Sequence, residues 1–209
     1  MVVYNKFYRK IICKIKELLK CLVEIKRSDF NNTIKHGLYY GLEGLINMKS
    51  LIIFYSLEGN TKFIADSINE ELKGDIVELA PVKQIPTTGF KKFLWGGKQV
   101  MFKEKPELQP ITADLSQYDL IVLGTPVWAS RFAPVFNTFL ENNNISNKKI
   151  ALFCCHGGGK EGKTFSDFKE KLKDNQFLGE IAFEEPLKKG KEENSLKAKE
   201  WIKAIKQSF

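Results

Sequence analysis

The segment 56–61, with the sequence Ser-Leu-Glu-Gly-Asn-Thr, lies between a short apolar run and a segment with helical spacing. An anion could accept hydrogen bonds here from the hydroxyls of Ser56 and Thr61, from the Asn60 amide and from the N–H groups of a helix's first turn. The helix dipole also favours negative charge at this end. Because Gly59 lets the backbone turn freely, we expect a phosphate site that needs no Lys or Arg. The alternative is an ordinary N-capped turn, since Ser, Asn and Thr all cap helices.

A second loop, residues 124–130, reads Gly-Thr-Pro-Val-Trp-Ala-Ser and follows another apolar run. Trp128 would offer a flat face to a planar ring, and stacked aromatic rings contribute about 0.5–1.5 kcal/mol beyond the area that they bury. The alternative is that Trp128 simply packs under its own loop.

A third loop, residues 155–162, reads Cys-His-Gly-Gly-Gly-Lys-Glu-Gly. Three consecutive glycines allow the backbone to approach a ligand and to present amides to its carbonyls or nitrogens. The alternative is a merely flexible turn. Cys155 and His156 also suggest a nucleophile and a base, but neighbours in sequence rarely point at each other and no orienting carboxylate is evident nearby.

The three loops follow apolar runs that are typical of strands buried on both faces of a parallel sheet. We expect strands at residues 51–55, 76–79, 120–123, 150–154 and 181–183, and helices near residues 60–73, 132–143, 164–174 and 194–208. This alternation predicts an α/β fold, a doubly wound three-layer sandwich with a five-stranded parallel sheet. Right-handed crossovers favour the strand order 2-1-3-4-5, which brings the three loops together beyond the carboxyl ends of the strands.

In these loops the chain resembles the flavodoxin family, in particular its short-chain bacterial flavodoxin-like members. SLEGNT matches the family's S/T-x-x-G-N-T phosphate loop, GTPVW matches the loop with an aromatic beside the flavin, and CCHGGG resembles the loop along the flavin ring. The resemblance covers residues 48–209 and implies a flavodoxin-like fold with bound FMN. The cofactor-binding residues that it implies are Ser56, Leu57, Glu58, Gly59, Asn60 and Thr61 at the phosphate, Thr125, Pro126, Val127 and Trp128 beside the isoalloxazine, and Cys155, His156, Gly157, Gly158 and Gly159 at its other edge.

The resemblance implies an electron-transfer protein without catalytic residues, whose partners are other redox proteins and whose flavin supplies the chemistry. The alternative is an enzyme, an NAD(P)H-dependent FMN or quinone oxidoreductase. Many electron-carrier flavodoxins are strongly acidic, whereas this domain is slightly basic, which would tolerate a phosphorylated nicotinamide. The segment 81–110 is also unusual, because residues 90–95 contain three aromatic side chains. These residues would form a plain covering helix, cover the flavin or receive a partner. A third possibility is a flavin-binding interaction module tethered by a basic arm.

One motif points to a different class of protein. Residues 157–164 satisfy the G-x-x-x-x-G-K-[ST] pattern of a nucleotide-binding P-loop and follow a strand. We interpret the match as fortuitous, because only 45 residues follow Thr164 and no apolar run ends in a magnesium-binding Asp. A phospho-receiver would need carboxylates directly after the first and third strands, where the sequence has none. The C-terminal lysines are mixed with glutamates, so we expect no nucleic-acid binding.

The first 47 residues differ in charge from the rest of the chain. The 209-residue chain has a net charge of +8, and residues 1–47 hold nine of its 33 Lys and Arg but only four of its 25 Asp and Glu. Residues 6–26 predict an amphipathic helix with a basic face, of the kind that lies on an anionic membrane or docks on a partner. Alternatively, Met48 is the true start and residues 1–47 are a translated leader. Membrane contact is expected only if these residues belong to the native protein.

The cysteines point to the compartment. Cys13, Cys21, Cys154 and Cys155 form neither a CxxC pair nor a metal-ligand spacing, so we expect reduced thiols and no metal site. No apolar stretch is long enough to cross a membrane. We therefore expect a cytoplasmic protein.

Overall fold

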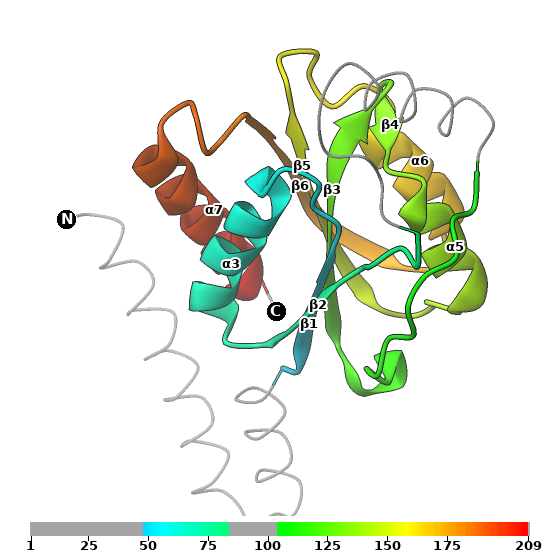
Figure 1. The fold of residues 1–209 in the computed structure, drawn as a ribbon. Coiled ribbons are helices and arrows are strands. Elements are labelled where there is room, and N and C mark those ends of the chain that lie inside the picture. Colours follow the sequence, from blue (N-terminus) through cyan, green and yellow to red (C-terminus); the bar gives the residue numbers. More distant parts are fainter. Residues whose placement is uncertain (1–47, 84–103, 209) are drawn as a thin grey trace, which may run out of the picture. The chain divides into compact units, whose positions relative to one another are not determined.

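The computed structural model describes residues 48–83 and 104–208, which form a parallel β-sheet with helices on both faces (Figure 1). In chain order the elements are β1 (Ser50–Phe54), α3 (Asn60–Leu72), β2 (Asp75–Glu78), the 3₁₀ helix η1 (Leu115–Gln117), β3 (Leu120–Trp128), β4 (Arg131–Phe132), α5 (Val135–Asn142), β5 (Lys149–His156), α6 (Thr164–Lys171), β6 (Gln176–Glu184) and α7 (Lys191–Lys206). The predicted amphipathic helix and the predicted covering helix at residues 90–95 lie outside the described residues. The division of the chain after residue 47 therefore stays a prediction.

Five strands of the sheet are parallel and lie in the order β2-β1-β3-β5-β6. When only these strands are counted, this is the predicted order 2-1-3-4-5, so the flavodoxin-like α/β fold class is confirmed. In the register, Ile52 of β1 pairs with Ile76 on one side and with Val122 on the other. The strand order reverses between β1 and β3, and in open α/β sheets ligands bind beyond the carboxyl ends at such a point.

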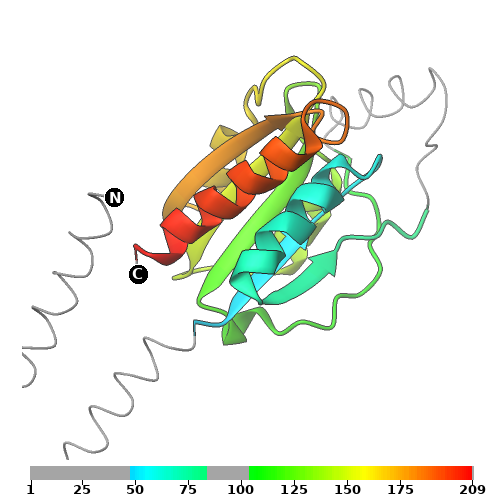
Figure 2. The same ribbon diagram turned by 90° about the vertical axis from the view of Figure 1, so that its left-hand side faces the viewer.

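Two helices cover each face of this sheet. α3 and α7 lie side by side on one face, and α5 and α6 cover the other (Figures 1 and 2). The hydroxyl oxygens of Ser67 in α3 and Ser195 in α7 are 3.0 Å apart and share a hydrogen bond. Because α3 follows β1 and α7 follows β6, both helices begin at the carboxyl edge of the strands.

The covering helices bury the central strands β1, β3 and β5 on both faces. Every residue of β1 is buried, and Ile52 and Ile53 have no exposed surface. On the side of α5 and α6, the rings of Phe132, Phe136 and Phe168 pack together, with the centroids of Phe132 and Phe168 4.5 Å apart. Burial on both faces explains why these strands read as continuous apolar runs in the sequence.

Three strands are longer than the sequence predicted, and β6 begins five residues before the expected 181–183. β3 continues to Trp128 and β5 to His156, so residues 125–128 and 155–156 belong to strand ends rather than to loops. After β3, Ala129 and Ser130 have positive φ values of 45° and 63° and turn the chain into the antiparallel strand β4. Two-residue hairpins of this kind are normally marked by Asn-Gly or a similar pair, so Ala-Ser gave no signal for the sixth strand.

Candidate functional site

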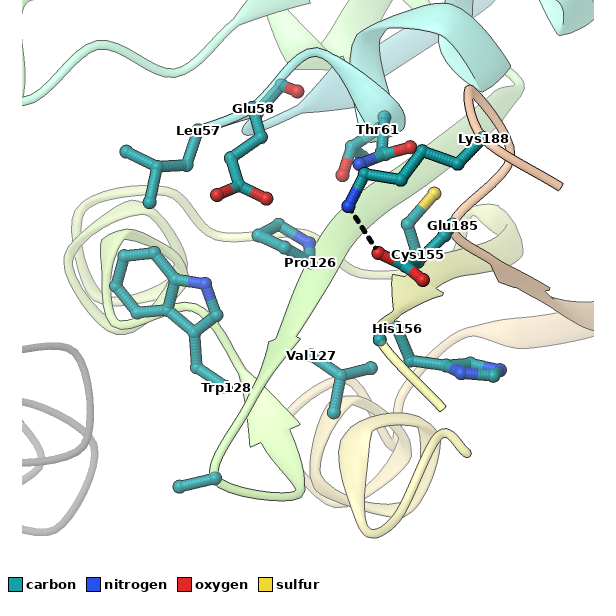
Figure 3. Close-up of a pocket in the computed structure, with 14 residues that line it drawn as sticks. Leu57, Glu58, Thr61, Pro126, Val127, Trp128, Cys155, His156, Glu185 and Lys188 are labelled. Atoms are coloured by element: carbon teal, nitrogen blue, oxygen red, sulfur yellow. Dashed lines mark hydrogen bonds and ion pairs between the residues drawn. The ribbon is translucent and has the colours of Figure 1, made fainter. Parts of the chain in front are cut away.

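A cleft of about 540 Å³ lies at the carboxyl ends of β1, β3, β5 and β6 (Figure 3). Four chain segments line it, one from the end of each strand. The lining residues are Ser56, Leu57, Glu58, Asn60, Thr61, Pro126, Val127, Trp128, Ala129, Cys155, His156, Gly157, Glu185 and Lys188. The structure thus brings together residues from all three of the predicted loops.

The first loop folds around the amino end of α3. Gly59 precedes the helix with a φ of +86°, a left-handed conformation that favours glycine. Ser56 Oγ accepts a hydrogen bond from the Gly59 N–H at 3.1 Å, and no side chain caps the helix. The helix therefore begins at a glycine, without a hydrogen bond from the side chain of its N-cap residue. Because Asn60 and Thr61 line the cleft, the first N–H groups of α3, which have no acceptor within the helix, are available to an anion there.

Another wall of the cleft is apolar. Trp128 ends β3, and its ring meets the ring of Tyr55 edge to face, with the centroids 5.8 Å apart at 82°. Burial raises the pKa of the Tyr55 hydroxyl to about 12, and the nearby Glu78 carboxylate adds to this shift. Trp128 itself stays partly exposed and lines the cleft with Pro126 and Val127 (Figure 3). Trp128 is therefore part of the cleft wall and not only a support beneath its loop.

The end of β5 carries the two groups that suggested a nucleophile and a base. Burial raises the pKa of the Cys155 thiol to about 12, although a hydrogen bond with Thr61 acts in the opposite direction. The thiol is thus protonated at neutral pH, and a thiol is a much weaker nucleophile than a thiolate. His156 Nδ1 accepts a hydrogen bond from the Gly158 N–H at 3.2 Å, within its own loop. These two side chains do not form a nucleophile–base pair.

The predicted residues that do not line the cleft are Gly59, Thr125, Gly158 and Gly159. Thr125 is fully buried, and its Oγ1 donates to the Pro126 carbonyl at 2.9 Å and accepts from the Ala133 N–H at 3.0 Å. It holds the backbone behind Pro126 instead of facing a ligand. The two glycines are exposed further along the third loop.

The sequence prediction missed three lining residues, Ala129, Glu185 and Lys188. Glu185 and Lys188 lie in a fourth loop, between β6 and α7, and form an ion pair with 2.6 Å between Glu185 Oε1 and Lys188 Nζ. The pair lowers the pKa of Glu185 and raises that of Lys188. The available signal was the position of this loop, because it follows a parallel strand and so reaches the same edge of the sheet as the other three.

The P-loop pattern at residues 157–164 does not form a nucleotide site. Thr164, whose hydroxyl would have to reach a magnesium ion, is fully buried at the start of α6. Within residues 48–83 and 104–208, no three His, Cys, Asp or Glu side chains are grouped so that they could hold a metal ion. In the same part of the chain, no helix has the length and apolar character needed to cross a membrane.

Comparison with known proteins adds sequence evidence to this geometry. The model of a flavodoxin family matches residues 49–204. A curated relative, the flavodoxin-like domain-containing protein BilS of Clostridioides difficile, is 32% identical over 157 residues, and the match covers 73% of this chain and 72% of the relative. The residues matched by the family model include all four segments that line the cleft.

Solved structures share the fold. A flavoprotein of Lactobacillus acidophilus in complex with FMN is 26% identical, with a TM-score of 0.59 over 70% of this chain and 100% of the other. Oxidised flavodoxin 2 of Bacillus cereus is 22% identical, with a TM-score of 0.50 over 77% of this chain and 99% of the other, and shows likeness in fold alone. The chain therefore belongs to the flavodoxin family and has the fold of a flavoprotein.

Proposed function

We propose that the protein binds FMN non-covalently in the cleft of Figure 3 and carries electrons between other redox proteins. The observation that carries this proposal is the presence, in one cleft, of an uncapped helix amino end and an apolar wall that contains Trp128. The L. acidophilus relative in complex with FMN supports it. When bound, FMN supplies the one- and two-electron chemistry.

The first loop fits the phosphate of FMN. The hydroxyls of Ser56 and Thr61, the Asn60 amide and the first N–H groups of α3 would hold the phosphate oxygens, and the helix dipole would stabilise their charge. The first turn of α3 contains no acidic residue that would oppose this charge. These donors are all neutral.

The rest of the cleft fits a flat ring. Pro126, Val127 and Trp128 would border one side of the isoalloxazine, and His156 and Gly157 would border another. Gly157 is exposed, and no atom lies within 4 Å of the place that a Cβ would take there. The flavin edge beside Gly157 would thus remain accessible to a second protein, as transfer between proteins requires.

The test is to titrate the purified protein with FMN and with riboflavin and to record the visible spectrum. We expect bound-flavin bands and a preference for FMN on the order of 100-fold, because several hydrogen bonds to a charged phosphate are lost with riboflavin. Absence of FMN binding would contradict the proposal. The loaded and reduced protein should then pass electrons to an oxidised haem protein. Rapid oxidation of NADH or NADPH with a quinone and no other protein would instead support a reductase.

A further inference from the structure

Lys188 gives the cleft a cation. Among the described residues that line the cleft, it is the only Lys or Arg. Its Nζ lies 2.6 Å from Glu185 Oε1 (Figure 3). The hydrogen bond with Glu185 and the Glu185 charge raise the pKa of Lys188, and the charge of Glu58, which also lines the cleft, adds to this shift. Lys188 is therefore a stable cation next to the loop assigned to phosphate.

The fourth loop is fastened to the first one. The Leu187 N–H donates to Asn60 Oδ1 at 3.1 Å, and a Cβ added to Gly59 would lie 3.4 Å from Leu187 Cδ1. The Lys188 N–H donates to the Glu185 carbonyl at 2.8 Å, which closes a tight turn in which Glu185 has a φ of 40°. These contacts hold the backbone of Lys188 beside the first loop.

The ion pair between Glu185 and Lys188 is easily exchanged. The Lys188 side chain is 69% exposed and the Glu185 side chain 27%. Exposed ion pairs contribute little, because water screens the charges and the long side chains lose conformational freedom. A phosphate monoester carries a charge of about −1.5 to −2 at neutral pH and offers three acceptor oxygens, more than one carboxylate provides. Lys188 would therefore gain by turning from Glu185 to a phosphate in the first loop.

We propose that Lys188 makes the cleft select a phosphorylated flavin over the unphosphorylated one, and that Glu185 competes with the phosphate for Lys188. This inference rests on the proposed function. It adds one charged contact to the neutral donors of the first loop and gives the two members of the ion pair opposite effects. Lys188 strengthens FMN binding, whereas Glu185 weakens it, and neither acts on riboflavin.

The chain provides a neighbouring ion pair as a control. Lys189 follows Lys188, and its Nζ forms an ion pair with Glu184 at the end of β6. Lys189 Nζ also lies 4.0 Å from Glu185 Oε2, a longer contact than the 2.6 Å between Lys188 and Glu185. Neither Lys189 nor Glu184 lines the cleft. Loss of charge at these two positions changes the net charge of the loop equally but removes nothing from the cleft.

The experiment measures Kd for FMN and for riboflavin with the full chain by flavin fluorescence. We expect Lys188→Gln to weaken FMN binding about tenfold, because a hydrogen bond to a charged group is lost, and to leave riboflavin binding unchanged. Lys188→Arg should keep most of the FMN affinity. Glu185→Gln should tighten FMN binding about threefold. The control variants Lys189→Gln and Glu184→Gln should match the unsubstituted protein.

The outcomes separate this inference from the proposed function. Equal FMN affinities of Lys188→Gln and Lys189→Gln would overturn the inference and leave FMN binding intact. Equal losses for FMN and riboflavin would also overturn it, because they would show a general effect on the cleft. If the unsubstituted protein binds neither flavin, the proposed function fails and the inference fails with it. Glu185→Gln keeps the test decisive if Lys188→Gln does not fold, since a gain in affinity cannot come from misfolding.

Discussion

The polar end of the cleft, formed by the first loop and Lys188, and the apolar end, formed by Pro126, Val127 and Trp128, would hold a cofactor by different means. The polar end depends on backbone direction, which the left-handed Gly59 and the start of α3 determine. The apolar end depends on area and on the support that Tyr55 gives to Trp128. A single wrong backbone angle would disable the polar end, whereas the apolar end would weaken in proportion to the area lost. We therefore expect the polar end to discriminate between flavins and the apolar end to bind them all.

The largest effect should come from Gly59→Ala. An alanine at a φ of +86° costs about 1–2 kcal/mol of the free energy of unfolding, and relief of this strain would turn the N–H groups of the first loop away from the phosphate. We expect the preference for FMN over riboflavin to fall at least about tenfold. Urea unfolding and flavin titration measure the two effects.

Gly159→Ala is the matched control for Gly59→Ala. Gly159 does not have a left-handed φ, and no atom lies within 4 Å of the place that its Cβ would take. Its free energy of unfolding should change by less than about 0.5 kcal/mol. An unchanged flavin preference in Gly59→Ala would show that the polar end does not depend on backbone direction.

Trp128→Ala should have the next largest effect, at the apolar end. Loss of its ring removes contact area and stacking, so we expect the affinities for FMN and for riboflavin to fall together, each about tenfold. Trp201→Ala is the control, because Trp201 is also partly exposed but does not line the cleft. A loss of affinity for FMN without a loss for riboflavin would contradict the idea that the apolar end binds all flavins alike. Fluorescence titration of both flavins decides the matter.

Asn60→Ala should have a smaller effect, confined to the polar end. It removes the acceptor of the Leu187 N–H, which loosens the fourth loop, and also removes the amide assigned to the phosphate. FMN binding should therefore weaken about fivefold, and the free energy of unfolding should fall by about 1 kcal/mol. Asn69→Ala removes an equivalent acceptor, for the Gly74 N–H at 3.1 Å, at the other end of α3. It should cost similar stability without a change in FMN affinity. Equal FMN affinities of the two variants would argue against this coupling.

The smallest effect concerns the ionisation of the Cys155 thiol. It does not change the free energy of unfolding at neutral pH, but it lowers this free energy at alkaline pH. Burial raises its folded-state pKa to about 12, whereas an unfolded thiol has a pKa of about 8.5. The unfolded chain therefore loses this proton first, and the free energy of unfolding falls as pH rises from about 8.5 toward 12, by at most about 1.4 kcal/mol per pH unit. Cys155→Ser should reduce this slope in urea unfolding. An identical slope in both proteins would contradict burial of the thiol in its neutral form.

The strands and the first loop could be predicted because their signals are local. A strand buried on both faces, such as β1, reads as an unbroken apolar run, and Ser, Gly, Asn and Thr after such a run indicate an anion-binding turn. The apolar end was predicted from the position of Trp128 after an apolar run and from the resemblance of the segment 124–128 to a flavodoxin loop. The turn that follows Trp128 passes through Ala129 and Ser130, whose positive φ values have no sequence signal.

The fourth loop could not be predicted in the same way. Glu185 and Lys188 look like ordinary surface charges in the sequence, and only the sheet order brings them to the cleft. Thr125 was predicted to face the cofactor, but its place inside the extended β3 turns its hydroxyl toward the backbone. Such details depend on tertiary packing, which no local pattern records.

The hydrogen bond between Leu187 and Asn60 joins residues that are 127 positions apart. A ribosome that adds about 5–20 residues per second therefore exposes the first loop for on the order of ten seconds before the fourth loop is made. During this interval the nascent chain has neither Lys188 nor the packing of α7 on α3. We expect the growing chain to bind FMN weakly until α7 has been synthesised and has packed on α3. Tight binding of the cofactor would then come late in the synthesis and folding of the protein.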